Sequence, residues 1–190
     1  RVAYNNGMKL GQIVLEKLVD GRKIVIRHMD KDDAEPMRTY INKLSKEQTF
    51  ITYQGEEVTV EEEREHVEGA IKKMEKGTMV KLLLVVDGLV AGIAESSLGI
   101  RTHSHVGGLG LSLDSSVRGQ GLGRLLLETT ISEAKKELKG LRMIELTVFN
   151  KNAIAIKLYK SVGFKEVARI PEKIFYKGEY VDEVVMMLKA

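Results

Sequence analysis

The chain has 190 residues, of which 43% are hydrophobic and 30% charged, and its formal net charge is only +3; this length and composition fit one globular domain with its own core. The absence of cysteine excludes disulfides, a cysteine nucleophile and thiolate metal sites, and we expect no metal. The sequence has no basic stripe typical of nucleic-acid binding, no apolar run long enough to span a membrane and no secretory signal, so we expect a cytoplasmic protein with neither kind of partner.

Hydrophobic periodicity and turn signals divide the chain into strands and helices. An Asp-Gly pair at residues 20–21 predicts a hairpin between two short strands, with a helix over residues 11–19 as the alternative. Thr59 is a typical N-cap, while Gly77 and Gly140 are typical helix ends. In chain order, the sequence predicts strands at 13–19 and 23–27, a helix at 34–44, an irregular loop at 48–58, a helix at 59–76, strands at 79–86, 89–100 and 106–113, a helix from 122 to about 139, a strand at 143–149, a helix at 152–161, and strands at 164–170 and 180–188.

The segment Arg118-Gly119-Gln120-Gly121-Leu122-Gly123-Arg124 joins a predicted strand to a long predicted helix. Its glycines let the main chain adopt conformations barred to other residues and come close to a ligand. The unpaired amides of the first helical turn and the positive end of the helix dipole form an anion site. We expect a phosphate or pyrophosphate there, with Arg118 and Arg124 adding charge; the alternative is a glycine-rich turn that only joins the two elements.

The glycine spacing excludes the two commonest phosphate-binding motifs. A dinucleotide fingerprint needs glycine at the sixth place counted from Gly119, where Arg124 stands. A Walker loop ends in Gly-Lys-Ser or Gly-Lys-Thr, whereas Gly123 is followed by Arg124 and Leu125. The remaining pattern is Arg-x-x-Gly-x-Gly, which disfavours a nucleotide-binding regulatory domain.

A second block follows the predicted strand at 143–148. It has the pattern Asn-x-x-Ala-x-x-Leu-Tyr-x-x-x-Gly-Phe, running from Asn152 through Tyr159 to Phe164. Together, the glycine loop and this block resemble the GNAT superfamily of acetyl-CoA-dependent N-acetyltransferases. The resemblance covers roughly residue 24 to the C-terminus.

The resemblance implies an α/β (α+β) fold with a GNAT-like mixed, mostly antiparallel sheet of about seven strands flanked by about four helices. In that arrangement the strands ending at Leu113 and Val148 splay apart and hold the cofactor between them. It also divides the chain into an N-terminal extension at 1–23, which could add a strand, and an N-acetyltransferase domain at 24–190.

Acetyl-CoA is the cosubstrate that the resemblance implies. Small residues on one face of the strand at 106–113 leave an open strip for the pantetheine arm. A main-chain N–H around Leu111, Ser112 and Leu113 would polarise the thioester carbonyl. The resemblance places the pyrophosphate on the loop formed by Arg118, Gly119, Gln120, Gly121, Leu122, Gly123 and Arg124.

Two residues of the second block have expected roles. Asn152 caps its helix and, by resemblance, also binds the pantetheine arm. By the same resemblance Tyr159, whose phenol is protonated at neutral pH, donates a proton to the departing thiolate; the alternative is a tyrosine that only packs in the core.

The acceptor amine must lose a proton before it attacks, and Glu95 is our candidate base. It shares a predicted strand face with Leu89, Ala91 and Ile93, so one carboxylate interrupts an apolar stripe, and burial would suit it to accept a proton. The alternative is that Glu95 lies past the sheet edge in solvent. Further acceptor-side candidates are His103, His105, Glu56, Glu57, Tyr180 and Asp182.

We therefore expect an N-acetyltransferase that transfers acetyl from acetyl-CoA to a primary amine of a small molecule or protein by direct attack in a ternary complex, since no cysteine can carry the acetyl group. The alternative is a non-catalytic acyl-CoA sensor on the same fold, which need not keep Tyr159 or a base. No segment encodes the acceptor, although the mildly basic chain weakly disfavours a strongly cationic one. An edge strand at either terminus suits a homodimer.

Overall fold

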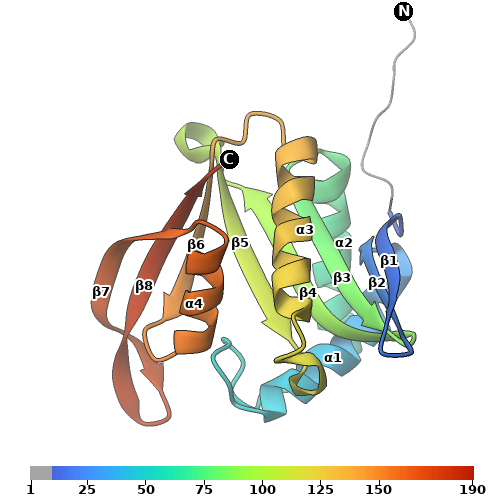
Figure 1. Cartoon of the computed structure of the whole chain (residues 1–190), viewed down its shortest axis with the longest axis horizontal. Helices are drawn as coiled ribbons and strands as arrows, with labels where there is room; N and C mark the ends of the chain where they lie inside the picture. The colour runs from blue at the N-terminus through green and yellow to red at the C-terminus, as the bar shows by residue number, and fades with distance from the viewer. Residues whose placement is uncertain (1–9) are drawn as a thin grey trace, which may run out of the picture.

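The computed structural model describes residues 10–190, which form one eight-stranded sheet and four α-helices (Figure 1). The elements are β1 (Ile13–Val19), β2 (Arg22–His28), α1 (Ala34–Lys46), α2 (Val60–Glu75), β3 (Met79–Val86), β4 (Leu89–Leu98), β5 (Val106–Leu113), α3 (Leu122–Glu137), β6 (Met143–Phe149), α4 (Ala153–Ser161), β7 (Lys165–Tyr176) and β8 (Glu179–Lys189). The strand order is β1-β2-β3-β4-β5-β6-β8-β7. Every neighbouring pair is antiparallel except β5 and β6, which are parallel.

This architecture confirms the predicted mixed, mostly antiparallel sheet, with eight strands in place of about seven. The hairpin around Asp20-Gly21 is confirmed, because β1 pairs with β2, and the alternative helix over residues 11–19 is wrong. Residues 1–9 of the predicted N-terminal extension lie outside the described part of the chain. The boundary at residue 23 therefore stays a prediction.

The strand β7 is longer than predicted, because it continues beyond residue 170 to Tyr176. Its register with β8 shifts between Ile170 and Ile174, and Glu172 there adopts a φ of +53°. This irregularity accommodates Pro171, which has no N–H for the sheet and which an edge strand tolerates at a bulge. The predicted end of this strand at residue 170 was therefore wrong, because β7 continues to Tyr176.

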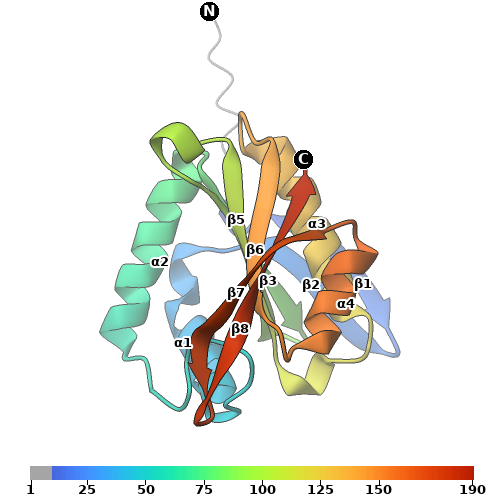
Figure 2. The same cartoon turned by 90° about the vertical axis from the view of Figure 1, so that its left-hand side faces the viewer.

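Helices cover both faces of the sheet, as Figure 2 shows edge-on: α1 and α2 lie on one face, α3 and α4 on the other. The central strand β3 is buried on both faces, so its side chains alternate between two hydrophobic cores. Leu82 and Leu84 pack in the core under α3 and α4, whereas Met79 and Leu83 pack in the core under α1 and α2. By this alternation Lys81 points to the α1 and α2 face.

The parallel strands β5 and β6 separate soon after they begin. They pair only from Val106–Met143 to Gly108–Glu145, while β5 stays paired with β4 as far as Leu113 and β6 stays paired with β8 as far as Phe149. A V-shaped opening therefore divides the sheet below this short parallel ladder (Figure 1). Both strands lead directly into the segments that the sequence marked as functional.

Candidate active site

The glycine loop ends in an exposed helix N-terminus. Gly121 is the N-cap of α3 with a φ of +77°, and the first main-chain hydrogen bond of the helix runs from Leu125 N to Gly121 O (3.1 Å). Within residues 10–190, no amide from 119 to 124 donates to a protein acceptor. A row of free N–H groups at the positive end of a helix dipole attracts an anion.

The three glycines of the loop serve two different purposes. Gly119 and Gly121 have positive φ angles (+74° and +77°), and a Cβ atom at either position would meet nothing within 4 Å, so the space in front of them is open. At Gly123 a Cβ atom would lie 2.8 Å from Leu113 Cδ1, so glycine there lets α3 pack closely on β5. Their positions leave the free amides accessible to a ligand.

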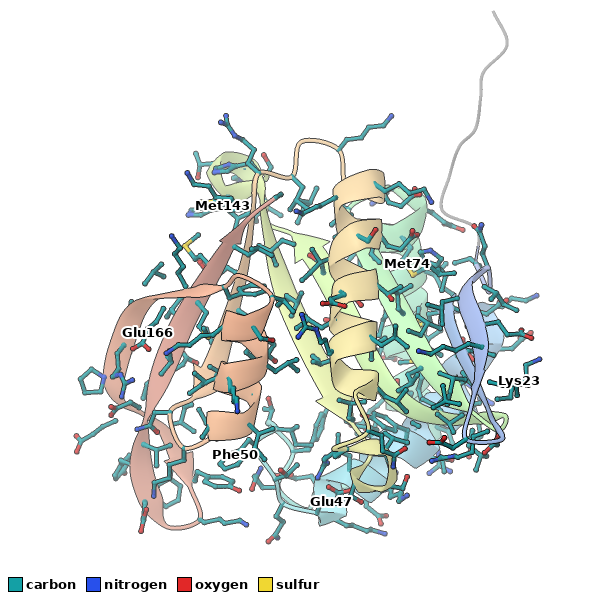
Figure 3. All side chains as sticks on the ribbon, viewed as in Figure 1. Lys23, Glu47, Phe50, Met74, Met143 and Glu166 are labelled. Atoms are coloured by element: carbon teal, nitrogen blue, oxygen red, sulfur yellow. The ribbon has the colours of Figure 1, made fainter. Side chains whose placement is uncertain are left out.

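The arginines of the loop are engaged with the protein. The guanidinium of Arg118 donates to Leu113 O at 2.7 and 3.0 Å and to the Glu47 carboxylate at 2.6 Å; Glu47 lies beside the loop at the end of α1 (Figure 3). Arg124 pairs with Glu128 one turn along α3 (2.8 Å). These contacts fix the loop, while the main chain supplies the anion site.

The side chain of Gln120 points toward the first hairpin. It donates to Ser116 O (2.8 Å) and accepts from Arg22 on β2 (3.3 Å). Leu122 is buried in the core, 4% exposed. In both residues the main chain, and not the side chain, faces the anion site.

Alternate residues of β5 direct their main-chain groups into the V-shaped opening. Asp114 N, one residue past the end of β5, donates to Ala91 O, and Gly99 N donates to Val106 O at the start of β5, both at 2.9 Å, so the main chain at these two positions faces β4. Because neighbouring residues of a strand face opposite sides, Leu111 and Leu113 face β6. The main chain of Ser112 faces β4, and its Oγ accepts from the Tyr40 hydroxyl (2.8 Å).

The second block forms α4, on the other side of the opening. The Asn152 side chain accepts a hydrogen bond from Ala155 N (3.2 Å), which confirms the predicted cap. Tyr159 is 7% exposed and packs edge-on against Phe164, with ring centroids 5.8 Å apart. Burial raises the pKa of Tyr159 to about 12, so its phenol keeps its proton at neutral pH.

A cavity of about 620 Å³ lies on the opposite face of the sheet. Its walls come from α1, α2 and the loop at 51–58, and its floor comes from β3, β4 and the β5 residues Gly110, Leu111 and Ser112. Phe50, labelled in Figure 3, holds this loop against β6 and β7 through its contacts with Phe149 (5.7 Å) and Tyr176 (5.3 Å). Through Gly110, Leu111 and Ser112 the cavity reaches β5 near Leu111, whose main chain faces the V-shaped opening.

A model of the acetyltransferase (GNAT) family matches residues 38–164 of this sequence, about two thirds of the chain. The chain belongs to the GNAT acetyltransferase family. It is 36% identical over 107 residues to the L-amino acid N-acetyltransferase AaaT of Escherichia coli K12, a match that spans 56% of this chain and 65% of that enzyme.

Two solved structures share the GNAT fold. An acetyltransferase from Streptococcus pneumoniae aligns with a TM-score of 0.80 and 27% identity, over 87% of this chain and 98% of its own. A Salmonella typhimurium protein described as an acetyltransferase, solved with its cofactor acetyl-CoA, aligns with a TM-score of 0.76 and 23% identity, over 87% and 93% of the two chains.

In this member of the GNAT family, Glu95 lies in the cavity but not in the setting that the sequence predicted. Its side chain is 34% exposed and forms an ion pair with Lys81 (2.8 Å), which is itself 3% exposed. Glu95 is opposite Gly110 in the β4–β5 register, so it is neither an unpaired buried carboxylate nor a solvated residue past the sheet edge.

A β-bulge overturns the predicted face of β4. The register with β3 steps from Leu84–Gly92 to Val85–Val90, which inserts Ala91 as an extra residue. Ala91 therefore packs under α3, whereas Ile93 packs in the core under α1 and α2, and Leu89 is 75% exposed. Glu95 shares its face with Ile93 but not with Ala91 or Leu89.

The other acceptor-side candidates divide into two groups. Glu56 and Glu57 line the cavity. The lining of this cavity, within the residues that the structure describes, includes none of His103, His105, Tyr180 and Asp182. His103 is exposed in a short 3-10 helix at Arg101–His103, and Tyr180 is 67% exposed on β8.

Four ionisable residues of the cavity were not among the predicted site residues: Glu62, Glu63 and His66 on α2, and Lys81 on β3. Lys81 Nζ lies 2.6 Å from His66 Nε2, and partial burial, with Lys81 nearby, lowers the pKa of His66. Lys81 could have been predicted as a functional residue, because it is the one charged residue in the apolar strand Met79–Val86. His66 and Glu63 carry a similar signal, because both lie at helical spacing with the apolar residue Val67 and its neighbours on one side of α2.

Two absences complete the description of residues 10–190. No helix in this range is long and apolar enough to cross a membrane. The same range holds no group of at least three His, Cys, Asp or Glu side chains placed to hold a metal ion.

Proposed function

We propose that this GNAT member is an N-acetyltransferase that transfers acetyl from acetyl-CoA to a primary amine by direct attack within a ternary complex. One juxtaposition carries the proposal. The free amides of residues 119–124 lie at one end of the β5 opening, and the cavity of about 620 Å³ meets the same strand at Gly110 to Ser112. A phosphate-bearing donor and an amine acceptor would thus meet across β5.

The residues fit coenzyme A as a ligand. The exposed N-terminus of α3 suits its pyrophosphate, and the open space at Gly119 and Gly121 lets the phosphates approach the main chain. The Leu111 main chain and the Leu113 N–H are available to an extended arm lying in the opening, much as to a neighbouring strand, while Leu113 O is already held by Arg118. Bound acetyl-CoA supplies the activated thioester.

The remaining steps belong to the chain's own side chains and amides. The Leu111 amide donates a hydrogen bond to the thioester carbonyl oxygen and stabilises the negative charge that develops there. Glu95, on β4 opposite Gly110 of β5, takes the proton from the acceptor ammonium, which frees the lone pair for attack. The carbon–sulfur bond then breaks, and Tyr159 gives its proton to the leaving thiolate. The new amide nitrogen loses its remaining extra proton to water, and solvent restores the proton of Tyr159 and removes that of Glu95.

The test is a thiol-release assay with acetyl-CoA and a panel of primary amines, combined with calorimetric titration of coenzyme A. We expect micromolar binding of coenzyme A and amine-dependent thiol release, with acetyl-amine product identified by mass spectrometry. Tight coenzyme A binding without turnover on any amine would instead support the sensor. Absence of coenzyme A binding would contradict both readings.

A further inference from the structure

The walls of the cavity are strongly acidic. Five carboxylates line it, while the cationic side chains that line it are Lys81 and, when protonated, His66. Lys81 is already paired with Glu95 (2.8 Å). The side chains that line the cavity therefore carry more negative than positive charge, in contrast to the small positive charge of the whole chain.

Most of these carboxylates have partners outside the cavity. Glu57 pairs with Lys46 (2.7 Å), Glu62 accepts from Thr59 N (2.8 Å), and Glu56 accepts from Gln54 N. Together with the Lys81–Glu95 pair, these contacts leave Glu63 as the exception. Among the described residues, the Glu63 carboxylate has no hydrogen-bond or ion-pair partner.

Glu63 is also the most buried of the five. The residue is 7% exposed, on the first turn of α2, and its side chain lines the cavity. Burial raises the pKa of Glu63, and the charge of Lys81 acts in the opposite direction. The residue as a whole is nine-tenths buried, but its carboxylate opens to the cavity and has no protein partner there, so a cation entering the cavity would meet a free acceptor of opposite charge.

We propose that Glu63 binds a second positive charge on the acceptor, so that the preferred acceptor is a primary amine carrying another cationic group, such as a diamine. This inference rests on the proposed function, because the cavity is read as the acceptor site. The reacting amine lies near Glu95 and Gly110, and the remote cation lies against the α2 wall.

The same charges disfavour an acceptor with a free carboxylate. Such a group would lie among the carboxylates of the cavity, and Lys81, its natural partner there, is already neutralised by Glu95. Like charges in a partly desolvated site repel. Simple amino acids should therefore be poorer acceptors than diamines of similar length.

Three acceptors of matched length test the inference: cadaverine, hexylamine and ε-aminocaproate, whose remote ends are positive, neutral and negative. We expect kcat/KM to fall in that order, with cadaverine about tenfold or more above hexylamine, because a charge-assisted hydrogen bond contributes about that factor. Equal kcat/KM values for cadaverine and hexylamine would overturn the inference while leaving the proposed function intact. Thiol release with none of them, nor with any other amine, would overturn both.

A variant pair assigns the preference to Glu63. Glu63→Gln should remove most of the cadaverine preference and leave kcat/KM for hexylamine within about twofold, since only the charge is lost. Glu65→Gln, an exposed change of equal charge on the same helix and outside the cavity, should keep the preference. If Glu63→Gln kept the cadaverine preference, Glu63 would not be the residue responsible for it. Glu63→Asp, which keeps the charge, should retain part of the preference.

A peptide N-terminus followed by lysine presents the same pair of cations from a different source. An Ala-Lys peptide compared with an Ala-Leu peptide distinguishes this source from a small diamine. A preference for Ala-Lys that Glu63→Gln abolishes supports the inference with a protein acceptor. Indifference to the second residue, with a cadaverine preference, supports it with a small-molecule acceptor.

Discussion

The protonation of Tyr159 is set by its burial. Its pKa lies near 12, above the ordinary value of about 10, so the protonated phenol persists until the pH approaches 12 and is lost only above it. If this phenol donates the proton to the thiolate, kcat should not decline because of Tyr159 between neutral pH and about pH 10. Measurement of kcat as a function of pH, at saturating concentrations of both substrates, tests this prediction. A decline with an apparent pKa near that of an ordinary tyrosine would contradict the assignment or its buried setting.

Replacement of Tyr159 separates chemistry from binding. Tyr159→Phe deletes one hydroxyl and little surface, so we expect kcat to fall about 100-fold while the Kd of coenzyme A stays within about twofold. Steady-state kinetics and calorimetry measure the two quantities. Tyr180→Phe is the matched control, because Tyr180 is exposed on β8 and outside the cavity. Full activity in Tyr159→Phe would transfer the acid role to water or another group.

A glycine pair separates backbone strain from ligand access. Gly121 and Gly140 both have positive φ angles (+77° and +84°) and open space around the missing Cβ atom, but only Gly121 precedes the free amides. Valine at either position should cost about 1–2 kcal/mol of folding free energy. Only Gly121→Val should weaken coenzyme A binding, about tenfold or more, because its side chain intrudes where the phosphates approach. Calorimetry and thermal melts check this, and equal Kd values would count against the anion site.

The sequence alone predicted the residues whose role depends on local main-chain geometry, such as Gly121 in the glycine loop and Asn152 at the N-terminus of α4. It failed where the role depends on partners distant in the chain. Glu95 was placed on the wrong stripe because one extra residue, Ala91, changes the face of β4, and the pairing with Lys81 was not encoded locally. Glu63 lies at helical spacing with Val67 and Ala70 on the apolar face of α2, so its position was readable from the sequence, whereas its place in a cavity beside Lys81 was not.

At the scale of elements, Arg118 joins the glycine loop to both β5 and the end of α1. Its contacts with Leu113 O and Glu47 position the free amides, so Arg118→Met and Glu47→Gln should each weaken coenzyme A binding. The effects should not add: the double variant should show a coupling of about 0.5–1 kcal/mol, as expected for a partly exposed pair. A double-mutant cycle by calorimetry measures this. Strictly additive losses would mean that the two residues act independently.

Most element bounds were predictable because their signals are local. Asp-Gly turns set the hairpins at 20–21 and 87–88, and the Thr59 capping box starts α2 one residue later. The bulges in β4 and β7 were not predictable, since an extra residue is tolerated or rejected according to what the strand packs against. The extension of β7 past Pro171 depends in the same way on its partner β8.

At the scale of the whole molecule, the two edges of the sheet differ. The edge strand β7 exposes Val167 (54%), Ile170 (39%) and Phe175 (65%) beside unpaired main-chain groups, a surface that a second copy could cover. We expect a homodimer through this edge, measurable by size-exclusion chromatography with light scattering. Val167→Lys should yield monomers, whereas Leu18→Lys on the opposite edge strand β1 should not. A monomeric wild-type protein at micromolar concentration would contradict the prediction.

The placement of the two binding regions on either side of β5 has a kinetic consequence. If acetyl-CoA and the acceptor bind as proposed, neither has to pass through the space of the other, and the spent coenzyme would be able to leave while the acetylated amine is still bound, or the reverse. In that case the two substrates would not need to bind in a fixed order. In the proposed arrangement the thioester would reach the acceptor through the sheet, so an acceptor that belongs to a larger molecule would need to insert only its terminal amine.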